Sequence, residues 1–236
     1  MIDKLCAELS LPPAVRSAAH AKAIAMNPAN ASPLEAATRS RTSWPAGYLL
    51  RINFLEGEQE VQQKVIFYAQ RWCEYANIIF DFDYHPDAEI RITFKPGFSE
   101  SYLGMDALSI PVNTATMNLW LTSSDSDEDY SHLVLHEFGH ALGLIHEHQS
   151  PVAGINWNRD AVIRELTSPY YNCTKQYIEL NYFERLTISQ SQYTRFDPYS
   201  IMLYDIPARW TLDGFSTRKN IVLSATDKQF ISRLYP

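Results

Sequence analysis

Four short stretches of the chain have the apolar and polar pattern of β-strands. They cover residues 48–55, 78–82, 90–94 and 117–121, and the alternation is strictest over 90–94. No internal repeat interrupts this series. The pattern therefore predicts a sheet that is built mainly from the first half of the chain.

Apolar residues at helical spacing predict helices over residues 58–75, 130–142 and 159–166 and after Ser224. In the last of these, Ser224 is placed as the N-cap, with Asp227 three residues further on, as in a capping box. Strands and one helix thus come first, and a helix and mostly irregular chain follow. This order predicts an α+β fold in two lobes.

An acidic run, Asp125 to Asp129, stands directly before the helix predicted over 130–142. Acidic residues in front of a helix complement its dipole, so capping is one interpretation of the run. A calcium site is the alternative, because carboxylates at such spacing are calcium ligands.

The first 43 residues differ in composition from the rest of the chain. They are rich in alanine and contain helix-breaking prolines, and a turn signal, Trp44 to Gly47, follows them. We interpret residues 1–43 as an N-terminal arm or pro-segment. Residues 44–236 then form the main domain, with an upper lobe over about 44–143 and a lower lobe over about 144–236.

Composition narrows the possible partners and compartments. The 236 residues are 46% hydrophobic and carry a formal net charge of −7, so a nucleic-acid partner is not expected. No apolar run is long enough to span a membrane. The first eight residues carry two acids and do not resemble a secretory signal, so we expect an intracellular protein or an exported one whose signal lies outside this sequence.

Cysteines are few and histidines are clustered. Three cysteines, Cys6, Cys73 and Cys173, permit one disulfide and require none. Five of the seven histidines fall between residues 132 and 148. Such a cluster indicates metal chemistry in this stretch of the chain.

The histidines at 136, 140 and 146 have the spacing of a zinc site. Residues i and i+4 share a helix face, so His136 and His140 can present two imidazoles to one zinc ion. Glu137 then lies beside the metal, where a general base for the metal-activated water is needed. Gly143 can end the helix and redirect the chain, which lets His146 supply a third ligand.

A chance match to the motif, or a set of unrelated surface histidines, is a poor explanation of this pattern. From this composition HExxH alone would occur in about one chain in a hundred, and the added Gly143 and His146 lower that to the order of 10⁻⁵. His132 and His148 lie outside the pattern, so we assign His132 no role and expect His148 to lie near the site or on the surface.

The run from His136 to His146 has the signature HExxHxxGxxH and resembles the metzincin metallopeptidases, and the following Glu147 resembles the astacin branch. The stretch Ser200 to Tyr204 is similar to the methionine-containing turn of that family. Trp44 to Gly47 resembles the start of the astacin catalytic domain, and His146 to Pro151 and the last fourteen residues are similar to microbial members. The resemblance therefore covers about residues 44–236.

The resemblance implies a fold and an activity. The fold would have an upper lobe with a twisted mixed sheet and two long helices, an irregular lower lobe that ends in a helix, and an active-site cleft between them. The protein would be a monomeric endopeptidase with one catalytic Zn²⁺, held by His136, His140 and His146. Glu137 would act as general base on protein or peptide substrates.

The family also implies roles for Met202 and Tyr204. Met202 would form a floor under the imidazoles, and Tyr204 would bind zinc at rest and stabilise the scissile carbonyl during catalysis. Substrate would extend along an exposed sheet edge, which we place at residues 117–121. Two alternatives stay open, namely a degenerate zinc-binding interaction module and a zinc hydrolase that acts on a non-peptide bond.

The arm departs from the family pattern, because it lacks the Phe-x-Gly-Asp segment whose aspartate caps the zinc of astacin zymogens. We nevertheless expect the arm to inhibit, with a cut site at Arg39 to Arg41. The resemblance implies that the new amino terminus then reaches Glu147. Cys6 could cap the zinc as a thiolate, or it could be a small apolar residue that packs against the domain.

Overall fold

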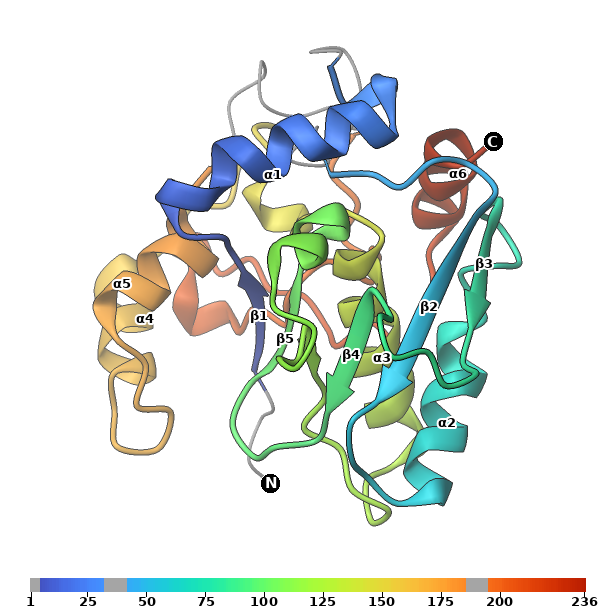
Figure 1. The fold of residues 1–236 in the computed structure, drawn as a ribbon. Helices are drawn as coiled ribbons and strands as arrows, with labels where there is room; N and C mark the ends of the chain where they lie inside the picture. Colours follow the sequence, from blue (N-terminus) through green and yellow to red (C-terminus); the bar gives the residue numbers. More distant parts are fainter. Residues whose placement is uncertain (1–4, 32–41, 186–194) are drawn as a thin grey trace.

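A six-stranded mixed sheet is the frame of the upper lobe in the computed structural model, which describes residues 5–31, 42–185 and 195–236 (Figure 1). The strand order is β1-β5-β6-β4-β2-β3, and every neighbouring pair is parallel except β5 with β6. The strands are β1 (Cys6–Leu9), β2 (Tyr48–Phe54), β3 (Ile78–Asp81), β4 (Ile90–Thr93), β5 (Ser99–Tyr102) and β6 (Met117–Asn118).

Three of the predicted strands are confirmed, and the role predicted for the fourth is wrong. Residues 117–121 were expected to form an exposed edge, but their strand is only β6, which pairs with β4 on one side and β5 on the other. The sequence pattern missed β5 because Ser99-Glu100-Ser101 lacks the apolar residues of a typical strand. In the described part of the chain, β5 is the strand to which the arm strand β1 adds.

The helices of the described residues are α1 (Pro13–Met26), α2 (Gln59–Ala69), α3 (Asp127–Ala141), α4 (Arg159–Leu166), α5 (Lys175–Ile178) and α6 (Ala225–Leu234). Four of these six described helices were predicted, although α2 ends at Ala69 and not at residue 75. Helices α1 and α5 were not predicted; α1 forms because Pro13 stands at its first position, where a proline is tolerated.

The lower lobe is otherwise irregular, apart from short turns such as the π-helical turn η4 (Glu179–Phe183), and it ends in α6. The predicted α+β architecture is therefore confirmed. No helix among the described residues is long and apolar enough to cross a bilayer.

Helix α3 lies at the centre of the molecule, and every residue from Tyr130 to Ala141 is buried. Its first turn holds the acidic run, and Ser126 and Asp129 form a reciprocal capping box at its N-terminus. Asp129 also pairs with Lys219 of the lower lobe. The capping interpretation of the acidic run is therefore confirmed.

The last carbonyl groups of α3 accept hydrogen bonds from side chains near the two ends of the main domain. Trp44 Nε1 donates to the carbonyl of Ala141 at 2.8 Å, and the Tyr235 hydroxyl donates to the carbonyl of Leu142 at 2.6 Å. The backbone N–H of Trp44 donates in turn to the Tyr235 hydroxyl at 3.2 Å. These contacts matter because the last carbonyls of a buried helix have no partner within the helix.

The arm packs against the domain over its described residues. Strand β1 extends the sheet, and α1 lies across the top of the molecule in Figure 1. Asn27 and Asn30 hold the start of the main domain, since their side-chain amides donate to the carbonyl of Ser43 at 3.2 and 3.0 Å. The predicted cut site at Arg39 to Arg41 lies outside the described residues. All three cysteines are free thiols.

Asp227 joins α6 to the turn that carries Met202. Its carboxylate accepts from the Ser200 hydroxyl at 2.7 Å, from the N–H of Ile201 at 2.8 Å and from the N–H of Ser224 at 2.9 Å. Ser224 caps the helix as the sequence predicts, and it forms the capping box with Asp227. Both oxygens of this buried carboxylate therefore accept hydrogen bonds.

Asp227→Ala should lower the free energy of unfolding by about 2–4 kcal/mol, because it removes the capping box and leaves buried donors unpaired. Urea denaturation monitored by circular dichroism measures the change. Asp160→Ala is the matched control, since Asp160 lies in the first turn of α4 but is exposed. Equal losses of unfolding free energy in the two variants would show that the buried hydrogen bonds of Asp227 add nothing to stability.

Candidate metal centre and catalytic site

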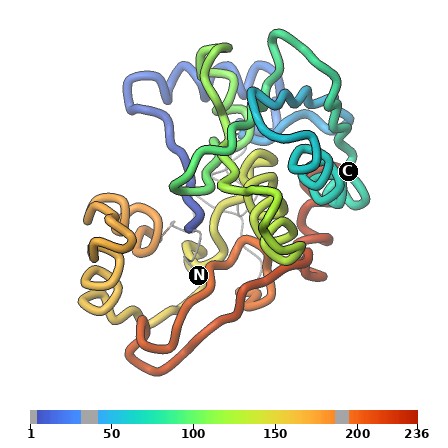
Figure 2. The backbone as a smooth tube through the Cα atoms, turned by 90° about the horizontal axis from the view of Figure 1, so that it is seen from below, coloured from blue at the N-terminus to red at the C-terminus, as the bar shows by residue number. Residues whose placement is uncertain are grey.

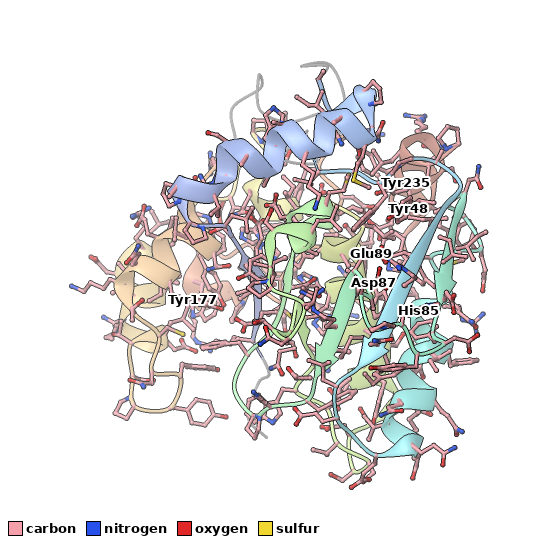
Figure 3. The ribbon with its side chains drawn as sticks, in the orientation of Figure 1. Tyr48, His85, Asp87, Glu89, Tyr177 and Tyr235 are labelled. Atoms are coloured by element: carbon pink, nitrogen blue, oxygen red, sulfur yellow. The ribbon has the colours of Figure 1, made fainter. Side chains whose placement is uncertain are left out.

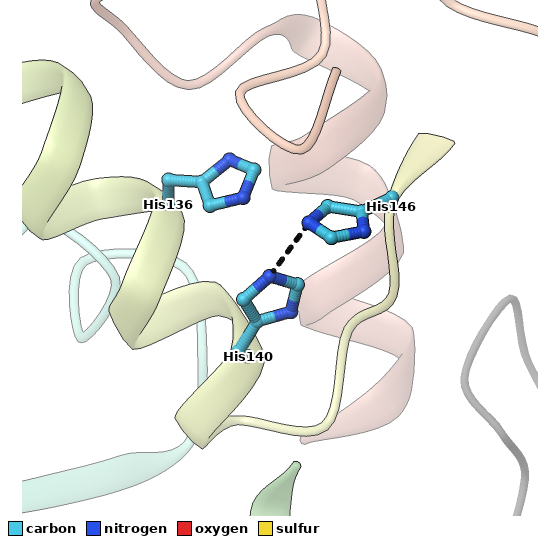
Figure 4. A group of neighbouring side chains, drawn as sticks. All are labelled: His136, His140 and His146. Atoms are coloured by element: carbon cyan, nitrogen blue, oxygen red, sulfur yellow. Dashed lines mark hydrogen bonds between the residues drawn. The ribbon is translucent and has the colours of Figure 1, made fainter. Parts of the chain in front are cut away.

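Three histidines meet where α3 ends and the chain turns back (Figure 4). His136 and His140 project from α3, and His146 comes from the segment that follows it. Gly143 makes the turn with φ of +93°, a conformation that side-chain-bearing residues rarely adopt. Its N–H donates to the carbonyl of His140 at 2.7 Å, and this bond closes the helix as the sequence predicts.

The imidazole nitrogens are spaced for one metal ion. One ring nitrogen from each of the three histidines lies within 4.8 Å of the other two. His140 Nε2 lies 3.1 Å from His146 Nε2. Two imidazoles on a tetrahedral zinc, with bonds of about 2.0–2.1 Å, would hold their nitrogens about 3.3 Å apart. His136 Nε2 is buried and has no hydrogen-bond partner in the protein.

Backbone carbonyls fix the direction of two of the rings. His136 Nδ1 donates to the carbonyl of Ile201 at 2.8 Å, and His140 Nδ1 donates to the carbonyl of Leu144 at 2.8 Å. Each Nε2 is therefore left as an inward-facing lone pair, which is how proteins orient histidines that bind metal.

Burial keeps these imidazoles neutral. It lowers the pKa of His136 and His146 well below the ordinary value and that of His140 to about 4. Neutral imidazole is the form that binds zinc. The residues present therefore fit a catalytic zinc ion with three protein ligands.

Met202 lies against α3 at Gly139. A side chain at Gly139 would place its Cβ 2.4 Å from the Met202 sulfur, so glycine permits this close contact. The carbonyl of Met202 accepts from the N–H of Glu147 at 3.0 Å, next to His146. The role of Met202 as a floor under the imidazoles, which the family resemblance implies, stays a prediction.

Glu137 is fully buried beside the three histidines. Among the described residues, the Cys6 thiol of the arm is the one hydrogen-bonding neighbour of its carboxyl group. Burial raises the pKa of Glu137 well above its usual range. A buried carboxyl group without a partner from its own domain costs stability, and such groups are found where function requires them.

Tyr204 reaches the same centre from the lower lobe. Its ring centroid lies 4.3 Å from that of His146, and its hydroxyl donates to the carbonyl oxygen of Cys6 at 2.7 Å. Burial raises the pKa of Tyr204 well above the ordinary value, so its hydroxyl stays protonated and can donate.

Cys6 enters the site from the arm. Its sulfur, one nitrogen of His136 and one oxygen of Glu137 lie within 4.8 Å of one another. A cavity of about 200 Å³ continues from Cys6 between α3 and the lower lobe; its polar lining includes Asp129, His132, Arg209 and Lys219. The arm thus lies in the cleft between the two lobes.

The remaining histidines have structural partners. His132 Nδ1 pairs with the carbonyl of Asn220 at 2.7 Å, outside the metal group. His148 is buried, stacks on His146 with centroids 5.2 Å apart, and its Nε2 pairs with the carbonyl of Asn181 at 2.7 Å. His148 therefore lies near the site, as expected, and it links the metal group to the segment that contains Asn181.

Glu147 takes part in the lower lobe's own hydrogen bonding. It accepts from the N–H of Asp197 at 2.9 Å, and burial raises its pKa to about 7. The predicted contact between Glu147 and a new amino terminus belongs to a cleaved chain and stays a prediction.

The chain is similar to two solved structures of myroilysin. One is 44% identical with a TM-score of 0.81, over 84% of this chain and 98% of that chain. The other is 38% identical with a TM-score of 0.68, over 99% of this chain and 91% of that chain.

A third similar structure is high choriolytic enzyme 1, a hatching enzyme zinc-protease from the medaka fish Oryzias latipes. It is 19% identical with a TM-score of 0.54, over 82% of this chain and 94% of that chain. At this identity the likeness is one of fold. No family model matches the chain, and no curated protein matches it.

His140→Ala should lose most of its zinc on dialysis against a weak chelator, because two ligands hold the ion far less tightly than three. Metal content per chain, measured by mass spectrometry, checks this. His132→Ala is the control, since it removes a buried imidazole one turn before His136 and should keep about one zinc per chain. Undiminished zinc in His140→Ala would exclude His140 as a ligand.

Proposed function

The chain belongs to the astacin-like branch of the metzincin zinc metallopeptidases, and from this we propose that it cleaves extended protein substrates with Glu137 as general base. The protein is a zinc metalloendopeptidase, as its similarity to myroilysin and to the hatching enzyme indicates. The observation that carries the proposal is the buried carboxyl group of Glu137 beside three inward-facing imidazoles, with no hydrogen-bond partner in the described main domain.

Each residue of the site has a distinct task in this proposal. Zinc, when bound by the three histidines, supplies a Lewis acid that lowers the pKa of water towards about 7. Glu137 accepts a proton from the attacking water and delivers it to the leaving amine. The Tyr204 hydroxyl donates to the substrate carbonyl oxygen as negative charge develops there. Burial of both groups excludes bulk water from the proton transfer.

Substrate would bind as an added strand on β5. The arm strand β1 already binds in this way, with Cys6 opposite Ser99 and Leu9 opposite Tyr102. Main-chain pairing of this kind accepts many sequences, because it uses groups that every peptide carries. The same edge can therefore serve a protein substrate after the arm has left.

The two alternatives fit the site less well. A zinc-binding interaction module needs neither Glu137 nor Tyr204, and a buried carboxyl group without a partner in the main domain would only cost it stability. A hydrolase of non-peptide bonds would not need a sheet edge that pairs with an extended chain. Activity on casein would distinguish a peptidase from both.

Glu137→Gln should keep zinc and stability but lose casein hydrolysis by about 10²–10⁴-fold, the usual contribution of a general base. The enzyme is assayed with casein, with and without a chelator, and its zinc content is measured in parallel. Glu60→Gln is a suitable control, since Glu60 is an exposed carboxylate in the first turn of α2, outside the metal group. Turnover of Glu137→Gln close to wild type would mean that another group activates the water.

The arm is proposed to inhibit the enzyme, with Cys6 as its latch. The Cys6 sulfur lies at the metal group, and the Tyr204 hydroxyl is held by the Cys6 carbonyl. Thiolate is a strong zinc ligand, and coordination to zinc deprotonates a thiol even where burial disfavours its charge. In the alternative, Cys6 stays a buried thiol that packs against the domain beside Glu137.

Cutting the full chain after Arg41 with immobilised trypsin should raise casein hydrolysis at least about tenfold, and full-length Cys6→Ala should show part of that rise. Cys73→Ala is the control, because its thiol lies outside the metal group and should leave the full chain inhibited. If cutting changed nothing, the arm would be a simple extension. If only Cys6→Ala changed nothing, the arm would inhibit without a thiolate.

A further inference from the structure

We propose that Tyr177 and Asn181 of the lower lobe form a second line of main-chain hydrogen bonds for the substrate, opposite the edge of β5. We call the Tyr177 hydroxyl and the Asn181 side-chain amide the lower rail. The inference rests on the proposed peptidase function and adds two positioning residues to it.

The arm strand is bound along both of its edges. On the upper edge it pairs with β5, where the N–H of Ser99 donates to the carbonyl of Leu5 at 3.0 Å. On the lower edge the Tyr177 hydroxyl donates to the carbonyl oxygen of Cys6 at 3.0 Å. The side-chain oxygen of Asn181 accepts from the N–H of Glu8 at 3.1 Å.

These lower-edge contacts recognise only the backbone. In an extended strand the carbonyl of one residue and the N–H of the residue two places further on face the same edge. Cys6 and Glu8 present such a pair, and no side chain of the arm takes part in the two bonds. Any extended peptide in the cleft carries the same groups, so the lower rail is not specific to the arm.

Tyr177 and Tyr204 donate to the same carbonyl oxygen, at 3.0 and 2.7 Å. The lower rail therefore begins beside the residue that is proposed to act on the scissile carbonyl. Burial raises the pKa of Tyr177 well above its ordinary value, so Tyr177 is a donor throughout the neutral range.

The lower rail is held in place by the segment that follows the third histidine. His148 pairs with the carbonyl of Asn181 at 2.7 Å, and Gln149 donates to the carbonyl of Leu180 at 2.8 Å. The Asn181 side chain also donates to the carbonyl of Tyr177 at 3.1 Å. The rail thus keeps a fixed distance from the metal ligand His146.

Across the cleft the Tyr177 ring stacks on Phe98, with centroids 5.0 Å apart, just before β5 begins. Figures 1 and 2 show β1 between the sheet and the part of the lower lobe that contains α4 and α5. The stack thus joins Tyr177 to the residue that precedes β5.

The test uses enzyme released from the folded full chain by trypsin and a quenched fluorescent peptide that extends on both sides of the scissile bond. Tyr177→Phe keeps the ring and its stacking and removes only the hydroxyl. It should raise KM about 3- to 10-fold, the value of one hydrogen bond, with kcat little changed. Tyr204→Phe should instead lower kcat by about 10²-fold.

Tyr48→Phe is the matched control, and Figure 3 shows Tyr48 and Tyr177 in different parts of the molecule. The Tyr48 ring stacks on Trp44 with centroids 5.2 Å apart, and its hydroxyl makes one hydrogen bond, to Glu89 at 3.2 Å. Removal of the Tyr48 hydroxyl should leave KM unchanged. A KM of Tyr177→Phe equal to that of wild type would overturn the proposal.

A second measurement distinguishes direct binding of the substrate backbone by Asn181 from a purely structural role of this residue. In a series of peptides, one backbone N–H at a time is replaced by an ester oxygen. One replacement should weaken binding to the zinc-loaded Glu137→Gln enzyme about 3- to 10-fold, and Asn181→Ala should abolish that difference. Equal sensitivity of both enzymes to every ester would refute the role of Asn181.

Failure of the inference and failure of the proposed function give different results. If wild-type enzyme cleaves no peptide, the peptidase function itself is wrong. If wild type cleaves and the Tyr177 and Asn181 variants match it in KM and ester sensitivity, only the lower rail is wrong.

Discussion

The fold is organised by the complete burial of α3. A helix surrounded by protein cannot use water for its terminal carbonyls or for the outer nitrogens of its histidines, so each group needs a partner from elsewhere in the chain. Trp44 and Tyr235 serve the C-terminal carbonyls, and the turn before Met202 serves His136. The two lobes are held together because each supplies groups that the other must satisfy.

The burial of α3 also sets the protonation and hydrogen bonding of the side chains in the site. It keeps the imidazoles neutral and leaves the Glu137 carboxyl group without a partner in the described main domain, which would be costly in an inert core. In the described chain the arm provides interaction partners for three parts of the cleft. A thiol lies at the metal group, a carbonyl receives the tyrosine hydroxyls, and a strand completes the sheet edge. Under the proposed function, the arm and the substrate would compete for one set of main-chain contacts.

The sequence predicted those parts that depend on local spacing. The helix positions of His136 and His140, the turn at Gly143 and the cap at Ser224 follow from short-range geometry and were confirmed. Strand β5 was missed because its residues are polar and its strand conformation comes from pairing. Tyr177 and Asn181 could not be found, because a tyrosine and an asparagine in an irregular segment carry no periodic signal. Only the folded chain brings them opposite β5.

The bonds that join Trp44, Tyr235 and the end of α3 also bear on how the protein folds. They connect positions 93 to 191 residues apart in the sequence, so long loops must close before these bonds can form. Until they form, the C-terminal end of α3 lacks partners, and the turn that directs His146 has no fixed support. A partly folded chain therefore has the histidines but not their arrangement, so hydrolytic competence arises only once these bonds have formed.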